Sequence, residues 1–260
     1  MKRRACGFSI VELLLVAAIF SAFLIVSYGL LNTGLSSWKR TANSQDVDLE
    51  FSKAAAALKR DLRDTAVRHA STRTTPWLPP GGTRGNVLWF LSAVDPASGQ
   101  FVRKKDGTPF WQRNIVYYLA IPSEHDALYG VRCGSGRYHC PHGMLVRRVF
   151  DTGQATSASS PEARIEKLMT PAQVGERLKR PRTAHRLEFG NPTAESEEVV
   201  AVGLVDFAAT VAPTGFPNEV ELRLSGFQLA EAGKVMRLGQ EDMSLSPYTR
   251  SLLLSVVPGN

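Results

Sequence analysis

The chain begins with a long apolar segment that carries a single acidic residue. A basic stretch, residues 2–4, precedes this segment, and Leu13 to Trp38 are 26 consecutive residues without a charge. At about 1.5 Å per residue, a helix of that length spans a hydrocarbon core of roughly 30 Å. The exception is Glu12, which lies near the start of the apolar segment.

An unpaired carboxylate is costly in hydrocarbon, by about 2.5–3.5 kcal/mol at the middle of a bilayer. Glu12 is therefore expected to have a function and a partner. If the chain is cut after Gly7, the new α-amino group on Phe8 lies one helical turn from Glu12, on the same chain or on a neighbouring one. In a dry environment, a correct pair of amine and carboxylate is strongly favoured over an unpaired charge.

Residues 7–14 (Gly-Phe-Ser-Ile-Val-Glu-Leu-Leu), with the basic leader and the apolar segment around them, closely resemble the type IV prepilin processing signature. Type IV pilins and type II secretion pseudopilins share this signature. The resemblance implies that a prepilin peptidase removes residues 1–7, cutting between Gly7 and Phe8, and that the new N-terminus on Phe8 is methylated. It also implies that Glu12 sets the register between subunits, and that the partners are other pilins or pseudopilins, the peptidase and the inner membrane.

Two other kinds of N-terminal segment share some of these features. A secretory signal peptide has a basic start, but its apolar stretch is usually about 7–15 residues long and ends in small residues. The segment here is longer and has no A-x-A-like end before Trp38, although Ser21-Ala22 leaves some room for a cut. A plain signal anchor with an accidental glutamate is the second alternative. The positive-inside rule keeps residues 2–4 in the cytoplasm, so a single pass through the bacterial inner membrane and a periplasmic or extracellular C-terminal domain are expected.

The remaining sequence predicts an amphipathic helix followed by a β-rich domain. Apolar residues recur every three or four positions from Val47 to Ala66, which predicts that residues 39–75 continue the membrane or filament-core helix of residues 8–38. Residues 76–260 contain runs typical of strands, separated by turn signals. The predicted strands are 86–94, 115–121, 144–150, 199–211, 220–224 and 252–257, the last of them paired inside the sheet. The fold class is therefore α+β and pilin-like, with a long N-terminal helix packed on an antiparallel sheet.

Residues 152–192 interrupt the strand pattern and are expected to form an irregular insert outside the core, with one or two short helices between residues 161 and 180. A cluster of basic residues lies at its end: Arg177, Lys179, Arg180, Arg182 and Arg186. Such a cluster is usually a solvated surface, although it also suits contact with phosphates of DNA or of lipid headgroups. Without the leader the net charge falls from +7 to +4, which does not by itself indicate a nucleic-acid binder.

Two cysteines remain after the leader, which contains Cys6, is removed. Cys133 and Cys140 have six residues between them and lie in a segment expected outside the cytoplasm, where disulfides persist. A disulfide between them is expected. Free thiols and a metal site are the alternatives, the second because three histidines lie nearby in the sequence, His125, His139 and His142. The cysteine spacing does not match the close ligand pairs of zinc sites, so no metal and no other cofactor is expected.

No catalytic motif of a serine hydrolase, zinc protease, phosphate-binding loop or calcium-binding loop is present in the sequence. The chain is therefore not expected to be an enzyme. It is expected to be the substrate of the peptidase that cuts after Gly7. Residues 114–119 with 144–148, and residues 58–63, loosely resemble the PilW and J-type minor subunits, and the chain is longer than a usual major pilin.

The expected function is that of a minor type IV pilin or type II secretion pseudopilin that helps to initiate or cap a filament. The alternative is a single-pass membrane-anchored module that binds DNA or a secreted protein, without a role in a filament. Pilus, secretion and DNA-uptake subunits share the same N-terminal signature, so the sequence does not choose among these systems.

Overall fold

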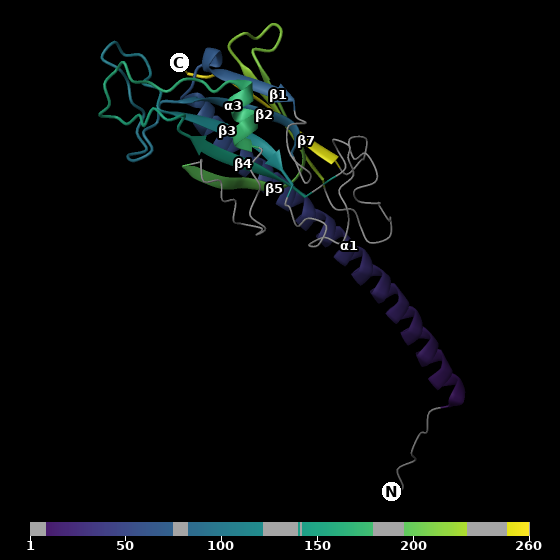
Figure 1. Ribbon diagram of the computed structural model, residues 1–260. Helices are drawn as coiled ribbons and strands as arrows, with labels where there is room; N and C mark the ends of the chain where they lie inside the picture. The colour runs from purple at the N-terminus through teal and green to yellow at the C-terminus, as the bar shows by residue number, and fades with distance from the viewer. Residues whose placement is uncertain are drawn as a thin grey trace.

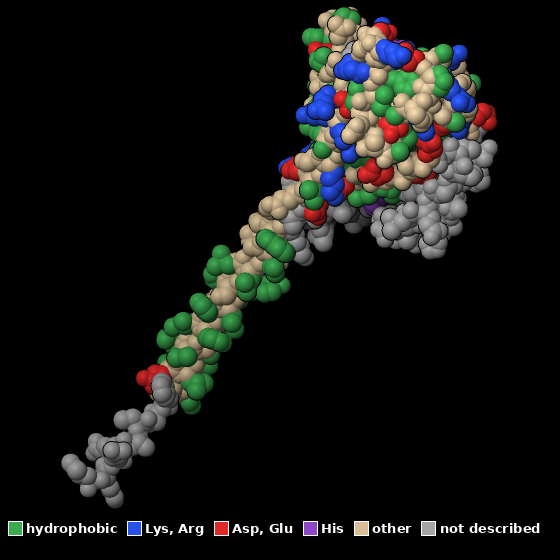
Figure 2. Space-filling view, turned by 90° about the vertical axis from the view of Figure 1, so that its left-hand side faces the viewer, with side chains coloured by type: hydrophobic (Ala, Val, Ile, Leu, Met, Phe, Trp, Pro, Cys, Tyr) green, Lys and Arg blue, Asp and Glu red, His purple; other side chains and the backbone are tan. Residues whose placement is uncertain are grey.

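The computed structural model describes residues 9–74, 83–121, 140, 142–178, 195–227 and 249–259. Helix α1 (Ile10–Arg63) is 54 residues long, and its first half projects from a sheet domain as a rod (Figure 1, Figure 2). As far as Arg63, the two segments predicted from the sequence, 8–38 and 39–75, therefore belong to one continuous helix.

The helix ends at Arg63 and not near Pro76, as the sequence had suggested. A short 3₁₀ helix follows (Val67–His69), and Ala70–Thr74 then form strand β1, which pairs with β2. The predicted boundary was wrong because no glycine or proline marks the true end of the helix. Pairing with β2 recruits residues 70–74 into the sheet, and tertiary contacts of this kind override local helix propensity.

A seven-stranded antiparallel sheet forms the rest of the domain, with its strands in sequence order from β1 to β7. The remaining strands are β2 (Thr83–Ser92), β3 (Arg113–Ala120), β4 (Gly143–Phe150), β5 (Ser196–Val211), β6 (Val220–Phe227) and β7 (Thr249–Val256). All six strands expected from the sequence are present, and β1 is an addition. The α+β class with an antiparallel sheet is therefore confirmed.

Strand β7 is the last strand in the order of the described sheet, where it pairs with β6. The prediction that residues 252–257 lie inside the sheet was wrong. The difference is one of backbone pairing, because β7 has a described partner strand, β6, on one side only. Its alternating burial, with Leu253 65% exposed, is that of a strand in an antiparallel sheet with one solvated face and does not distinguish an edge strand from an inner one.

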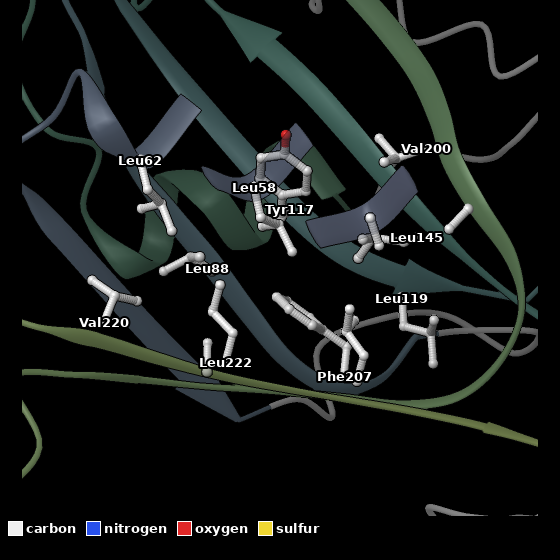
Figure 3. Close-up of a cluster of buried hydrophobic side chains, with 14 of the residues drawn as sticks. Leu58, Leu62, Leu88, Tyr117, Leu119, Leu145, Val200, Phe207, Val220 and Leu222 are labelled. Carbon is white, nitrogen blue, oxygen red and sulfur yellow. The ribbon is translucent and has the colours of Figure 1, made fainter. Parts of the chain in front are cut away.

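The sheet curls around the second half of α1. Thr72 of β1 and Asn86 of β2 both donate a side-chain hydrogen bond to the carbonyl oxygen of Ala209 in β5, at 3.2 and 2.7 Å, although three strands separate β1 from β5 in the order. The helix stripe predicted from the sequence fills the curl, because Leu58 and Leu62 are fully buried among side chains of β2 to β6 (Figure 3). Phe51 and Ala54 belong to the same core.

The segment after β4 packs on the opposite face of the sheet, where α3 (Pro171–Leu178) lies across the strands (Figure 1). Val174, Leu178 and Met169 are buried there against side chains of β2, β3 and β4. The indole nitrogen of Trp89 donates to the carbonyl oxygen of Met169 at 2.9 Å. Residues 152–178 therefore cover a second core, and the expectation of an insert outside the core was wrong, although one short helix was correctly anticipated.

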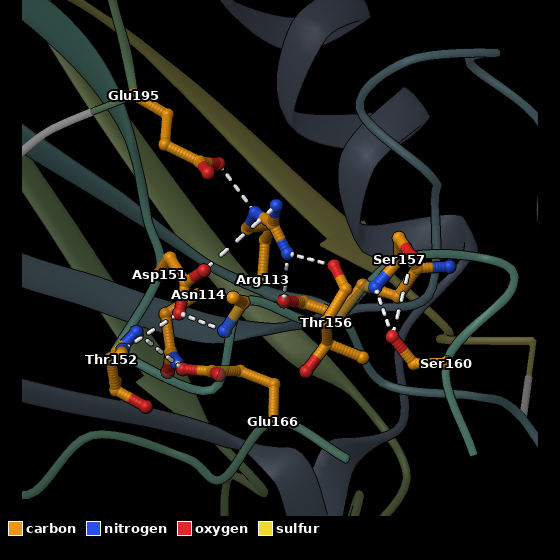
Figure 4. A network of polar contacts seen from close by, with 12 residues as sticks. Arg113, Asn114, Asp151, Thr152, Thr156, Ser157, Ser160, Glu166 and Glu195 are labelled. Carbon is orange, nitrogen blue, oxygen red and sulfur yellow. Dashed lines mark hydrogen bonds and ion pairs between the residues drawn. The ribbon is translucent and has the colours of Figure 1, made fainter. Parts of the chain in front are cut away.

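Glu166 fastens this segment to the sheet from a buried position (Figure 4). Its Oε1 accepts hydrogen bonds of 2.9 Å from Asn114 Nδ2 and from the backbone N–H of Thr152. Its Oε2 is buried and has no hydrogen-bond partner. Burial raises the pKa of Glu166 above the ordinary value of 4.5, because the desolvation of the charged form outweighs these two hydrogen bonds.

In a Glu166→Gln variant, the free energy of unfolding is expected to fall less, or to rise more, with increasing pH than in the native chain. Because the raised pKa makes the folded state bind the Glu166 proton more tightly than the unfolded state, this group lowers the free energy of unfolding as the pH rises through the interval between the two pKa values. Glutamine keeps the acceptor and carries no charge, so this contribution disappears and the variant is more stable at neutral pH. Urea unfolding over a pH series measures both effects, and an unchanged pH slope would contradict the assignment.

Candidate functional site

The first half of α1 presents an apolar surface on every side. Ile10–Trp38 form 29 residues with no buried position, long and apolar enough to cross a membrane or to act as a signal sequence. Exposed fractions run from 51% at Leu24 to 80% at Ile10 among its large apolar side chains. Figure 2 shows these side chains around the rod, with one acidic side chain near the start of the described helix. A surface of this kind is unfavourable in water and requires a covering.

Glu12 forms a capping box with Ser9 at the start of the helix. The Ser9 hydroxyl oxygen accepts from the backbone N–H of Glu12 at 3.4 Å, and the backbone N–H of Ser9 donates to Glu12 Oε2 at 2.9 Å. The carboxylate therefore folds back toward the N-terminal end of the chain. Its negative charge also interacts favourably with the positive end of the helix dipole. Gly7 and Phe8, the predicted cleavage and methylation site, lie outside the described residues.

Three hydroxyl groups within the apolar half of α1 donate to carbonyl oxygens of the helix itself. Ser21 donates to the carbonyl oxygen of Ala17 at 2.8 Å, Thr33 to that of Gly29 at 2.9 Å and Ser36 to that of Thr33 at 2.9 Å. These three hydroxyls need no water, which makes this half of the helix compatible with lipid or with packed helices.

A buried ion pair fixes the second half of α1 to the sheet. Asp61 is 9% exposed, and its Oδ2 accepts from the Tyr117 hydroxyl at 2.8 Å and from Arg147 Nε at 2.5 Å. Its Oδ1 accepts from Arg60 Nε at 3.0 Å. Tyr117 and Arg147 are cross-strand neighbours on β3 and β4. Burial, together with the Asp61 charge, raises the pKa of Tyr117, so the phenol remains a donor to Asp61.

Contacts on both sides of Asp61 also attach the helix to the domain. Glu50 Oε2 accepts from the backbone N–H of Val202 in β5 at 2.8 Å, and Asp48 pairs with Arg250 in β7 at 3.0 Å. At the end of the helix, the carbonyl oxygen of Arg63 accepts from Gly259 N at 3.0 Å. The rod is thus the continuation of a helix whose second half is attached to the sheet domain at several points.

The predicted cysteine and metal sites lie only in part within the described residues. Cys140 is buried and disulfide-bonded, whereas Cys133 lies outside the described chain, so their pairing stays a prediction. Among the residues with described positions, which include His142 but not His125 or His139, no group of three metal-ligating side chains is found.

Of the five basic residues at the end of the insert, the structure describes only Arg177. The Arg177 guanidinium lies 5.3 Å from the centre of the Phe150 ring, and its Nη2 donates to the carbonyl oxygen of Asp151 at 3.3 Å. Arg177 therefore helps to hold α3 against β4. The other four residues lie outside the described chain, and contact with an anion stays a prediction for them: Lys179, Arg180, Arg182 and Arg186.

Comparison of the chain with known protein families, with curated proteins and with solved structures found no match. The function must therefore be inferred from the described features of α1. Sequence analysis had identified the apolar surface and Glu12, but it missed the capping box, although Ser9 followed by Glu12 three residues later is its usual pattern. It also missed the Asp61 ion pair, whose members are far apart in the chain.

Proposed function

We propose that this protein is a minor type IV pilin or type II secretion pseudopilin, a structural subunit that helps to initiate or cap a filament. The observation that carries the proposal is the division of α1 into an exposed apolar half and a half that forms the core of the sheet domain. Burial of apolar surface contributes roughly 25 cal/mol per Å². Lipid covers the exposed half before assembly, and the helices of other subunits cover it afterwards.

In this proposal, residues 1–7 remain in the cytoplasm while the sheet domain is exported across the inner membrane. The prepilin peptidase then cuts between Gly7 and Phe8 and methylates the new terminus. The Glu12 carboxylate already lies toward this end of the chain, because it accepts from the N–H of Ser9, next to Phe8 in the sequence. In the filament, Glu12 pairs with an N-terminal amine and so sets the position of one subunit against the next.

Mass spectrometry of the mature chain tests the proposal directly. The expected N-terminus is a methylated Phe8, and a Gly7→Val variant is expected to keep Met1, because the larger side chain blocks the cut. Cys6→Ser is the matched control, since it changes the neighbouring leader residue and should leave processing unchanged. A membrane-anchored binding module would instead keep its leader. A mature chain that begins at Met1, or anywhere other than Phe8, would refute the proposal.

A further inference from the structure

A cavity of about 340 Å³ lies on the face of the sheet that packs on α1. Its lining comes from β2, β3, β4, the start of β5 and the turn around residues 94–99. Ile115 and Val149 belong both to this lining and to the core beneath α1. Together with Val94 and Pro96 they give the cavity apolar walls.

Arg147 supplies the polar anchor in this cavity. Its Nε donates to Asp61, which fixes the plane of the guanidinium. Its two terminal nitrogens, Nη1 and Nη2, have no hydrogen-bond partner within the described part of the chain, and the side chain is 17% exposed. Arg60 and the Tyr117 hydroxyl also contact Asp61, so Arg147 is not alone in balancing that carboxylate. The cavity therefore contains a positioned guanidinium with free donors.

The other charged groups of the lining are already engaged. Arg113 pairs with Glu195 through its Nε, and its Nη1 donates to the carbonyl oxygens of Gln112 and Thr156 at 2.8 and 2.6 Å (Figure 4). Asp95 accepts from the backbone N–H and the hydroxyl of Ser98, at 3.0 and 2.8 Å. Arg113 Nη2 pairs with Asp151 Oδ2 at 4.0 Å. Among the described lining residues, the Nη atoms of Arg147 are therefore the charged donors available to a ligand.

We propose that this cavity binds a carboxylate on a short apolar stem, held by paired hydrogen bonds from Nη1 and Nη2 of Arg147. A guanidinium binds carboxylates in this two-point manner, and the apolar walls suit the stem. The volume is near the lower end of the range for ligand sites, so the occupant is one residue and not a large molecule. The C-terminal residue of a polypeptide and an acidic side chain share this chemistry. The proposal does not depend on a role in a filament.

Three probes test the site on the full chain in detergent micelles, by saturation-transfer NMR titration. N-acetyl-leucine represents a chain terminus, N-acetyl-glutamate α-amide represents an acidic side chain, and N-acetyl-leucinamide is the neutral control. At least one acid is expected to bind at least about tenfold more tightly than the neutral amide, because hydrogen bonds to a charged group are lost with the carboxylate. The acid that binds more tightly identifies the source of the carboxylate, a chain terminus or an acidic side chain.

Two variants tie the binding to this cavity. Ser196→Trp places a large side chain at an exposed lining position of β5 and is expected to abolish binding, whereas Thr210→Trp, exposed on the same strand but outside the lining, leaves it unchanged. Arg147→Lys keeps the charge but loses the paired geometry, and a loss of about tenfold is expected. Equal binding of acid and amide, equal binding by the Ser196→Trp protein, or no saturable binding of either acid would overturn the proposal.

Discussion

An Asp61→Ala variant is expected to lose about 3–5 kcal/mol of its free energy of unfolding, the usual effect of removing one partner from a buried ion pair. The substitution leaves Arg147 without the acceptor of its Nε and leaves the Tyr117 hydroxyl without its acceptor in a buried position. The Tyr117 hydroxyl lost water on folding and does not regain it in the variant, because Tyr117 is fully buried. Because Asp61 lies on α1, the joint between the rod and the sheet is the part that weakens.

Urea unfolding of the full chain, followed by near-ultraviolet circular dichroism, measures this loss. Asp64→Ala is the matched control, because the Asp64 side chain is 26% exposed and lies 3.5 Å from Arg63, whose side chain is 79% exposed. An exposed pair of this kind contributes about 0–1 kcal/mol. Equal losses in the two variants would show that the buried network does not fix the helix to the sheet.

A double variant separates the cost of an unpaired charge from the value of the pair. When Asp61→Ala is combined with Arg147→Met, no guanidinium is left without its acceptor, and methionine fills similar space. Replacing a buried pair with apolar side chains is often close to neutral. The double variant should therefore be more stable than Asp61→Ala alone, and a double-mutant cycle gives the coupling between the two residues.

Periodicity predicted the helix, which buries one regular face, and runs of strand-forming residues between turn signals predicted six strands. Both signals missed β1, whose sequence Ala-Ser-Thr-Arg-Thr has no apolar alternation. That strand exists because its backbone pairs with β2 and because Thr72 reaches Ala209 across the curl. Pairing of this kind depends on the neighbouring strand and leaves no mark in the local sequence.

The second core was missed for a related reason. Residues 152–178 carry few apolar side chains, and three of them, Met169, Val174 and Leu178, pack on the outer face of β2, β3 and β4. The signal was present in β3, whose eight residues are all buried. A strand without an exposed face needs a layer on both sides, so the continuous run Ile-Val-Tyr-Tyr-Leu already implied a covering segment.

The site on α1 was only half visible in the sequence. The apolar surface and Glu12 are local features, and local features can be found by inspection. Asp61 resembled one more charge on the solvent face of the helix, and its burial follows from Tyr117 and Arg147, which approach it from β3 and β4. The cavity beside Arg147 is likewise assembled from four strands. Contacts between distant positions require the fold.

Glu12 is expected to be essential for assembly through its charge and not through its capping role. Glu12→Gln keeps an acceptor for the Ser9 N–H, since glutamine also completes a capping box. It removes the charge that would pair with the N-terminal amine of a neighbouring subunit. If pairing is the function, Glu12→Gln and Glu12→Ala both lower the fraction of the subunit recovered in filaments by at least about tenfold, the change that 1.4 kcal/mol produces.

Ser9→Ala provides the opposite control, because it removes the capping hydroxyl and leaves the Glu12 carboxylate in place. Loss of a cap costs about 0.5–2 kcal/mol of helix stability, but the charge pair survives, so assembly should stay near the native level. Immunoblots of sheared filaments, normalised to subunit in the membrane, compare the three variants. If Glu12→Gln assembles normally and Ser9→Ala does not, Glu12 acts as a helix cap, and the apolar surface of α1 alone determines how subunits meet.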